Sequence, residues 1–219
     1  VRTVSDDTGH VASKTKFTYK WLLTGYAMIE EVLDPDGDAL ATTWTYNEDV
    51  NSEKYGKVEF MRTPAGAEMR YEYDSLGRKV REYRPWLDSQ QAREIRYSYG
   101  AVDSQDSNYE LDERKPRMVT ERIDGTAVGR TYYSYRSGGR KVVTERCLNP
   151  NASFGDPGNL RTERTNFPRG TEAASAGKIK EVVYPDGRMD TYTYGYGSFT
   201  AQSDPEASAF TSGGRDVRQ

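Results

Sequence analysis

Residues 71–80 read Tyr-Glu-Tyr-Asp-Ser-Leu-Gly-Arg-Lys-Val, a pattern typical of a β-hairpin. Tyr71 and Tyr73 are two positions apart, so in a strand their side chains share one face. Asp74 suits the first position of a turn, because its carboxylate can accept a hydrogen bond from the backbone N–H two residues on. Gly77 suits the fourth position, because glycine enters the left-handed conformation without a Cβ clash.

The same arrangement recurs along the chain and marks an internal repeat. The run Gly-Arg-Lys-Val at 77–80 occurs again at 139–142, and Tyr133 follows Tyr71 by the same 62 residues. A turn glycine and the second tyrosine of the returning strand recur at four places: Gly37 and Tyr46, Gly66 and Tyr73, Gly125 and Tyr135, and Gly187 and Tyr194. The sequence therefore predicts an all-β fold, a curved antiparallel sheet of consecutive β-hairpins.

The chain divides on composition into a body and two polar ends. Residues 1–10 are expected to be a flexible leader, residues 11–200 the hairpin domain, and residues 201–219 a loose tail. Loop insertions are expected near 101–114 and 149–176, with one short charged strand at 160–165. Helical periodicity is weak everywhere, and 85–94 is the segment with the most helical character.

Composition excludes several classes of protein. The 219 residues carry 31 basic and 34 acidic side chains, a net charge of −3, which gives no footprint for nucleic acid or an anionic membrane. One cysteine excludes an internal disulfide framework. No apolar run is long enough for a transmembrane helix. The chain begins at Val1, and we interpret it as a piece of a longer protein whose targeting is not visible.

No catalytic or metal-binding residue and no cofactor is predicted. The sole histidine, His10, lies in the polar leader, so a histidine-based triad or metal site is excluded by count. Residues 34–38, Asp-Pro-Asp-Gly-Asp, suggest calcium, but they lack the rest of a calcium loop and are interpreted as a turn. A hydrolase with an unrecognised carboxylate pair is kept as a third hypothesis, because sequence does not reveal the separation of two carboxylates.

The aromatic residues allow two interpretations. The pairs Tyr71/Tyr73, Tyr97/Tyr99, Tyr133/Tyr135 and Tyr192/Tyr194 are expected to line up across strands. A cross-strand ladder, in which each pair contributes ~0.2–1 kcal/mol and fixes register, is favoured because the tyrosines follow the turns. The alternative is a sugar- or peptide-binding face on which three tryptophans serve as stacking platforms: Trp21, Trp44 and Trp86.

The strongest copy of the repeat resembles the tyrosine-aspartate (YD) repeat of the Rhs family, whose pattern is Gly, then Tyr-x-Tyr-Asp, then Gly-Arg and an aliphatic residue. The motif residues of the copies are Gly66, Tyr71, Tyr73, Asp74, Gly77, Arg78, Val80, Tyr133, Tyr135, Gly139, Arg140, Gly187, Tyr192 and Tyr194. The resemblance covers roughly residues 25–197, and the weaker copies replace the aspartate, for example with Asn47 and Arg136.

The resemblance implies a β-sheet that spirals into a shell, as in secreted bacterial polymorphic toxins and cell-surface proteins. We therefore expect a non-enzymatic wall segment or interaction scaffold in a secreted or cell-surface assembly. Its expected partners are other β-repeat segments or proteins at the sheet edges, because exposed strand edges promote pairing. The alternative function is a carbohydrate-binding or adhesion module, with a glycan as partner.

Overall fold

The computed structural model describes residues 1–5, 7–9, 11–86, 91–106, 114–171, 173–200, 209–212 and 216–218. Every regular element in these residues is a β-strand, and consecutive strands form hairpins, so the predicted all-β antiparallel fold is confirmed. The described residues contain no helix with the length and apolarity needed to cross a membrane.

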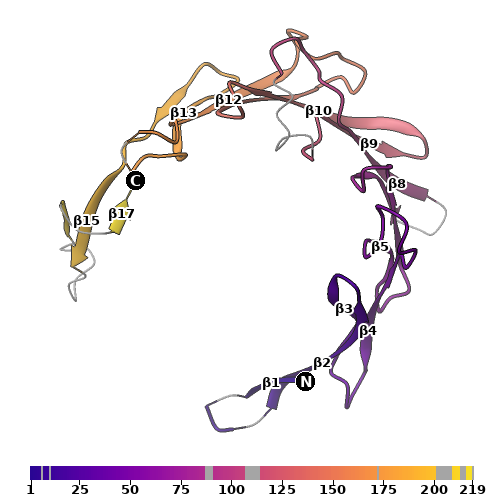
Figure 1. Cartoon of the computed structure of the whole chain (residues 1–219). Helices are drawn as coiled ribbons and strands as arrows, with labels where there is room; N and C mark the ends of the chain where they lie inside the picture. The colour runs from indigo at the N-terminus through magenta and orange to yellow at the C-terminus, as the bar shows by residue number, and fades with distance from the viewer. Residues whose placement is uncertain are drawn as a thin grey trace. The chain divides into compact units, whose positions relative to one another are not determined.

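One sheet contains fourteen strands, and Figure 1 shows them following one another in chain order. They are β1 (Arg2–Ser5), β2 (Val11–Leu22), β3 (Gly25–Leu33), β4 (Leu40–Tyr46), β5 (Val58–Arg62), β6 (Glu68–Tyr73), β7 (Lys79–Trp86), β8 (Gln91–Ser98), β9 (Met118–Ile123), β10 (Thr126–Arg136), β11 (Lys141–Arg146), β12 (Leu160–Asn166), β13 (Ile179–Val183) and β14 (Met189–Thr191). A second sheet has the order β16-β15-β17, from β15 (Gly195–Thr200), β16 (Ala209–Ser212) and β17 (Asp216–Arg218).

The domain organisation differs from the expected one in three ways. The leader contains a strand, because residues 2–5 find hydrogen-bonding partners in β2. The tail contributes β16 and β17, which pair with β15 across the expected boundary at residue 200. The chain also separates into two units. This is possible because each strand contacts only its neighbours, so few contacts join distant strands of the sheet. Unit 1 comprises residues 1–98 and 119–128, and unit 2 comprises residues 99–118 and 129–219.

The expected helical character at 85–94 is not realised. Residues 85–86 end β7, residues 91–94 begin β8, and Pro85 pairs with Ala92. The cross-strand ladder satisfies backbone groups over the whole length of both strands, which outweighs a weak local preference.

The turn at residues 74–77 forms as predicted. The Asp74 carboxylate accepts hydrogen bonds from the backbone N–H of Leu76 at 3.0 Å and of Arg78 at 2.9 Å. Gly77 has φ of +69°, and its N–H donates to the Asp74 carbonyl at 3.1 Å. The Arg78 guanidinium closes the turn with a 2.7 Å ion pair to the same carboxylate.

The same closure recurs at hairpin ends of very different loop length. The residue before the loop donates its N–H to the carbonyl of the residue after a glycine, and the glycine donates its own N–H back. Each of these glycines has φ between +69° and +82°. The closures join Asn47 to Gly56 and Lys57, Thr63 to Gly66 and Ala67, Asp74 to Gly77 and Arg78, Phe167 to Gly177 and Lys178, and Tyr184 to Gly187 and Arg188.

The 62-residue repeat is also present in the strand register. Tyr71 lies opposite Glu82 in the β6–β7 hairpin, and Tyr133 lies opposite Thr144 in the β10–β11 hairpin. Both members of the pair are displaced by the same 62 residues. These two hairpins are therefore equivalent positions of the repeat, one in each unit.

Buried positions are as often polar as apolar in the described residues. The buried hydrophobic side chains are Leu22, Val32, Tyr132, Val143, Cys147 and Ala174. The buried polar side chains are Glu82, Glu94, Arg117, Thr120, Ser134 and Glu145. A sheet of this composition depends on its backbone ladder and on paired polar side chains as well as on apolar burial.

Candidate functional site

The face of unit 1 that carries Tyr71 alternates aromatic and charged side chains. Glu82 of β7 lies between Tyr71 of β6 and Ile95 of β8 in register. The Lys79 ammonium lies 5.5 Å from the centre of the Tyr71 ring and 4.9 Å from that of Tyr97. The expected direct tyrosine ladder is absent between these strands, because the Lys/Arg-bearing strand of each repeat separates the tyrosine-bearing strands.

Glu82 is the centre of this face. Its side chain is 3% exposed, and it accepts hydrogen bonds from Lys79 Nζ at 2.8 Å, from the Arg84 guanidinium, and from the Tyr97 hydroxyl at 3.4 Å. Burial opposes ionisation, but the hydrogen bonds from Lys79 and Arg84 outweigh it and hold the pKa of Glu82 below its usual value. A carboxyl with a lowered pKa is suited to ion pairing rather than to proton donation near neutral pH.

The opposite face of the same strands carries a second ion-pair network. Glu94 accepts hydrogen bonds from the Arg81 guanidinium and from Arg96 Nε at 2.6 Å, and Arg122 Nε lies 3.9 Å away. Burial again opposes ionisation, but Arg96 and Arg81 hold the pKa of Glu94 below its usual value. On both faces the buried carboxylates of unit 1 are thus neutralised by cations of the same unit.

Unit 2 carries an open groove of about 830 Å³ on strands β10 to β13. Its lining residues are Lys115, Tyr133, Tyr135, Gly138, Gly139, Val142, Thr144, Thr162, Arg164, Asn166, Arg169 and Val182. Two rows of residues, each running across neighbouring strands in register, form its floor. One row is Tyr133, Thr144 and Thr162, and the other is Tyr135, Val142, Arg164 and Val182. Three of the lining side chains are cationic, and none of the described lining side chains is a carboxylate.

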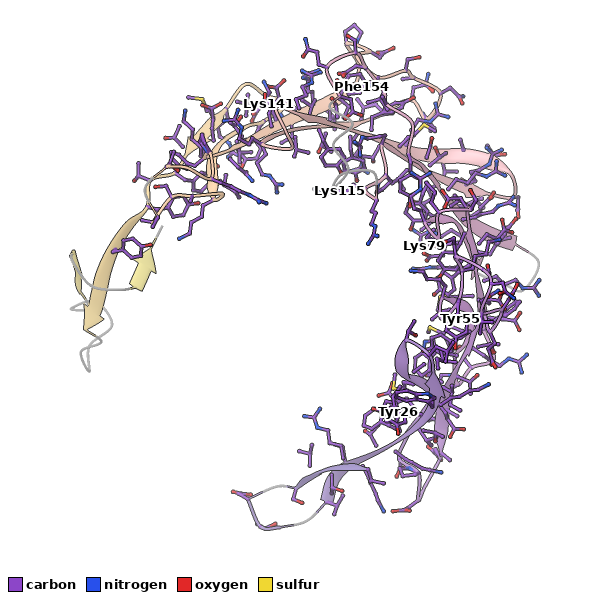
Figure 2. All side chains as sticks on the ribbon, viewed as in Figure 1. Tyr26, Tyr55, Lys79, Lys115, Lys141 and Phe154 are labelled. Carbon is purple, nitrogen blue, oxygen red and sulfur yellow. The ribbon has the colours of Figure 1, made fainter. Side chains whose placement is uncertain are left out.

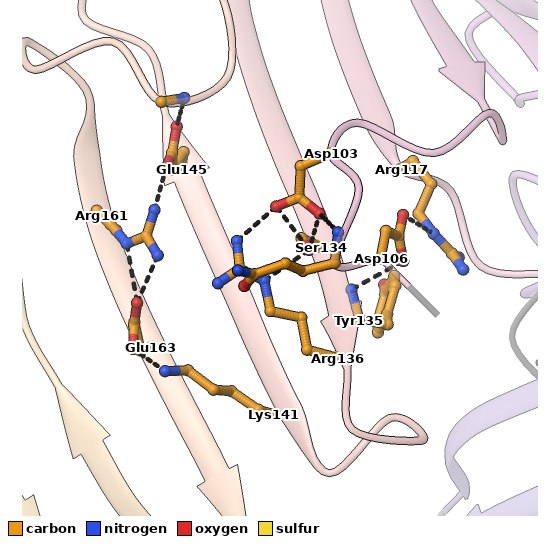
Figure 3. Close-up of polar contacts among 12 residues, drawn as sticks. Asp103, Asp106, Arg117, Ser134, Tyr135, Arg136, Lys141, Glu145, Arg161 and Glu163 are labelled. Atoms are coloured by element: carbon orange, nitrogen blue, oxygen red, sulfur yellow. Dashed lines mark hydrogen bonds and ion pairs between the residues drawn. The ribbon is translucent and has the colours of Figure 1, made fainter. Parts of the chain in front are cut away.

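Ion pairs hold the loops of unit 2, on the other face at Asp103 and beside the groove residue Tyr135 at Asp106. Asp103 pairs with Arg136 at 2.5 Å and accepts a 3.3 Å hydrogen bond from the Ser134 hydroxyl (Figure 3). Asp106 pairs with Arg117 at 2.7 Å and accepts a 3.2 Å hydrogen bond from the backbone N–H of Tyr135. Burial opposes ionisation of Asp103, but the hydrogen bond and the charge of Arg136 outweigh it and hold the pKa of Asp103 below its usual value.

A third clasp fixes the loop that precedes β12. The Glu145 carboxylate, 2% exposed, accepts hydrogen bonds from Arg161 Nη1 at 2.8 Å and from the Gly155 N–H at 2.6 Å (Figure 3). In that loop Phe154 packs edge-on against Tyr132, with ring centres 5.9 Å apart. Figure 2 shows Phe154 and Lys115 on opposite sides of the ribbon, so the face covered by the Phe154 loop and the groove are distinct surfaces.

The tryptophans that were predicted as binding residues do not share one environment. Trp21 is 61% exposed and packs edge-on against the exposed Tyr26, with ring centres 4.9 Å apart. Trp44 is half-buried in β4, opposite Met61. The side chain of Trp86 lies outside the described residues.

The last two tyrosines of the motif do not lie in the main sheet. β14 ends at Thr191, so Tyr192 and Tyr194 follow it, although the Tyr192 N–H still donates to the Lys180 carbonyl at 2.9 Å. Tyr194 packs edge-on against Phe167 at 6.2 Å. Likewise, Tyr99 follows β8, which ends at Ser98.

The aspartates at 34–38 form a turn. The Asp34 carbonyl accepts from the N–H groups of Gly37 and Ala39, and Lys14 pairs with Asp36 at 2.6 Å. Among the described residues no group of three or more His, Cys, Asp or Glu side chains lies close enough to hold a metal ion. The Ser134 hydroxyl near Asp103 accepts a hydrogen bond from Arg136 Nε, so an arginine occupies the place that a histidine takes in a catalytic triad. His10 lies outside the described residues.

No family model matches the sequence, and no curated protein matches it. Among solved structures, the chain is similar to a porin-like protein from Bacteroides uniformis ATCC 8492, at 14% sequence identity and a TM-score of 0.44. That match covers 92% of this chain and 77% of the porin-like chain. The inferences below rest on the residues of this chain.

Proposed function

We propose that the chain is a non-enzymatic structural module, a wall segment of an Rhs-like array of β-hairpins in a bacterial secreted or cell-surface assembly. The supporting observation is the strand order: β1 to β14 pair only in chain order. Such an array can be extended at either end by the same pairing that builds its interior.

Each terminal strand of the sheet offers a row of backbone groups to a further strand. At the two ends of β14, the Tyr192 N–H donates to the Lys180 carbonyl and the Arg188 carbonyl accepts from the Tyr184 N–H. Because residues of an antiparallel strand alternate in direction, the N–H groups of Met189 and Thr191 point away from β13. In β1, Thr3 lies opposite Lys14. The Lys14 carbonyl points toward β3, because it accepts a hydrogen bond from the N–H of Asp34, the residue after β3. Thr3 therefore also points its N–H outward.

Proline substitution at the outward positions tests the proposal. Thr3→Pro and Thr191→Pro remove an outward donor without removing a hydrogen bond of the existing sheet. We expect the wild-type chain to associate reversibly as its concentration rises, and each variant to associate more weakly in sedimentation equilibrium. Asp190→Pro is the matched control, because its N–H points into the β13 ladder, and it should lower stability.

A chain that stays monomeric up to its solubility limit would contradict the proposal. Association that is unaffected by both edge prolines would contradict it as well, because the contact would then lie on a face of the sheet rather than on its edges.

A second candidate function is adhesion to a glycan through the exposed Trp21–Tyr26 pair. Exposed aromatic faces can stack on sugar rings. Quenching or a shift of tryptophan fluorescence by a glycan, lost in Trp21→Ala and retained in Trp44→Phe, supports this function. A glycan array without binding removes it.

A further inference from the structure

We propose that one rim of unit 1, formed by the turns that follow β2, β4 and β6, inserts into the headgroup region of a zwitterionic lipid bilayer. This surface goes beyond the structural role and does not depend on it.

The three turns are neighbours. In a sheet of antiparallel strands that follow chain order, every second turn lies on the same rim. The Leu23 N–H in the first turn donates a 2.8 Å hydrogen bond to the Tyr55 hydroxyl in the second. A Cβ on Gly77 in the third turn would meet the Glu53 carbonyl oxygen of the second at 2.5 Å. The loop at 47–57 therefore joins the other two turns into one continuous rim.

Each of these turns exposes an aliphatic side chain. Leu23 is 75% exposed, Val50 is 60% exposed and Leu76 is 63% exposed. Behind Leu23, the exposed rings of Trp21 and Tyr26 lie opposite each other in register. The rim thus presents three aliphatic tips and, beside the first of them, a pair of aromatic rings.

The aliphatic residues do not follow the usual chemistry of turns. Leu23 stands in the two-residue turn of the β2–β3 hairpin, where Asn, Asp and Gly are preferred, and Leu76 stands inside the turn that Asp74 opens. The turns of the opposite rim at 34–39 and 63–67 contain no Leu, Ile, Val or aromatic residue. A local preference that is broken without a gain in packing is expected at a functional surface.

The size of the rim favours a lipid surface over a protein partner. A stable protein interface takes about 20–30 residues from each side. This rim offers a few large apolar side chains on three separate turns, which is too little for such an interface. Binding to a bilayer instead grows with each apolar side chain that enters it, and it needs no matching surface.

The charge of the rim selects the kind of lipid. Acidic and basic residues are close to balanced in the turns at 22–25, 47–57 and 74–78, so the rim has no attraction for an anionic membrane. The acidic residues are Glu48, Asp49, Glu53 and Asp74, and the basic ones are Lys54, Lys57 and Arg78. A zwitterionic bilayer is therefore the matching surface.

The order of residues along the first turn fits the depth of a bilayer interface. Trp21 lies two positions before Leu23, roughly 7 Å at the rise of a strand. Amphipathic rings favour the headgroup level, and interfacial segments bury their apolar groups about 5–10 Å deep. The N–H groups of Leu23 and Leu76 are already bonded to the Tyr55 hydroxyl and the Asp74 carboxylate, which lowers the cost of entering a less polar medium.

The experiment is flotation of the intact chain with phosphatidylcholine vesicles. We expect the chain to partition onto them, with an affinity that changes little when salt is raised or when phosphatidylglycerol is added. Leu23→Ser and Leu76→Ser should each weaken partitioning about tenfold, because each removes one inserted leucine. Brominated phosphatidylcholine should quench the tryptophan fluorescence of the wild type, and Trp21→Phe should reduce this quenching.

Leu40→Ser is the matched control, because Leu40 is an exposed leucine beside the 34–39 turn of the opposite rim, and it should leave partitioning unchanged. Far-UV circular dichroism of each variant shows that the sheet is intact. Four results would each overturn the proposal: no partitioning, partitioning that needs phosphatidylglycerol and is lost in salt, equal effects of the rim variants and Leu40→Ser, or self-association in lipid-free solution that Leu23→Ser abolishes, which would assign the rim to a second copy of the chain.

Discussion

The Tyr73 hydroxyl donates a 2.9 Å hydrogen bond to the backbone carbonyl of Val58 on the neighbouring strand. Tyr46 makes the same contact with Met28 at 2.8 Å. Both tyrosines also lie where the register shifts toward the following strand. Burial raises the pKa of both hydroxyls, which therefore remain donors. The second tyrosine of the repeat thus secures one side of its strand at the point where a bulge interrupts the other.

Removing this hydroxyl should lower stability modestly. Tyr73→Phe is expected to cost about 0.5–1.5 kcal/mol, the contribution of one hydrogen bond. Tyr73→Ala is expected to cost about 2–4 kcal/mol, because the ring is lost as well. Urea denaturation measures both. Tyr83→Phe is the control and should change stability little, because the Tyr83 hydroxyl makes no hydrogen bond within the described part of the chain. Equal effects of the two phenylalanine variants would disprove the contact.

Two turn glycines separate backbone strain from steric contact. Gly77 and Gly66 both have positive φ, but a Cβ on Gly77 would meet the Glu53 carbonyl oxygen at 2.5 Å, whereas nothing lies within 4 Å of a Cβ on Gly66. Gly66→Ala should therefore cost about 1–2 kcal/mol from conformation alone. Gly77→Ala should cost clearly more, because the 49–56 loop must also move. Thermal unfolding of both variants checks this, and a smaller loss at position 77 would show that the loop does not press on the turn.

The buried glutamates should make the protein sensitive to acid. The folded-state pKa values of Glu82 and Glu94 are lowered, so their ion pairs stabilise the fold fully above the usual glutamate pKa. This stabilisation is lost as the pH falls through the lowered folded-state values, where both carboxyls become protonated. Denaturation midpoints measured across the acid range should fall for the wild type and fall less for the double variant Glu82→Gln/Glu94→Gln. Parallel pH profiles would exclude these two groups as the cause.

Breaking the most buried ion pair should be costly. The side chains of Asp106 and Arg117 are 0% and 1% exposed, so Asp106→Ala leaves a buried guanidinium without its carboxylate. We expect a loss of about 3–5 kcal/mol. Asp103→Ala is the matched control, since the Asp103–Arg136 pair is partly solvated, and it should cost about 1–3 kcal/mol. Chemical denaturation of the two variants decides the order, and a larger loss at Asp103 would contradict the burial argument.

Sequence patterns predicted the parts of the fold that are encoded locally. The Asp74–Gly77 turn depends on the preferences of a few adjacent residues, and the period-two tyrosine pairs Tyr71/Tyr73 and Tyr133/Tyr135 located β6 and β10. The Glu94–Arg81 ion pair was not predicted, because it joins two strands through a register that no local pattern specifies. The Asp106–Arg117 pair was not predicted either, because Asp106 lies in a loop whose path the sequence does not specify. The groove was missed for the same reason: Lys115, Tyr133 and Arg164 come from separate elements. The apolar rim of unit 1 did leave a signal in the sequence, since Leu23 and Leu76 stand at turn positions that usually take polar residues or glycine.

The recurrent loop closure has a consequence for how such chains can vary. The same two hydrogen bonds seal the four-residue turn from Asp74 to Gly77 and the longer excursions from Asn47 to Gly56 and from Phe167 to Gly177. Because closing a longer loop costs only about 0.6 kcal/mol for each doubling of its length, material inserted between the sealing residues leaves the strands aligned. The loops between these closing hydrogen bonds are therefore suitable sites for inserting foreign peptides. They also allow the loops of related hairpins to diverge in sequence and length while the pairing of the strands is preserved.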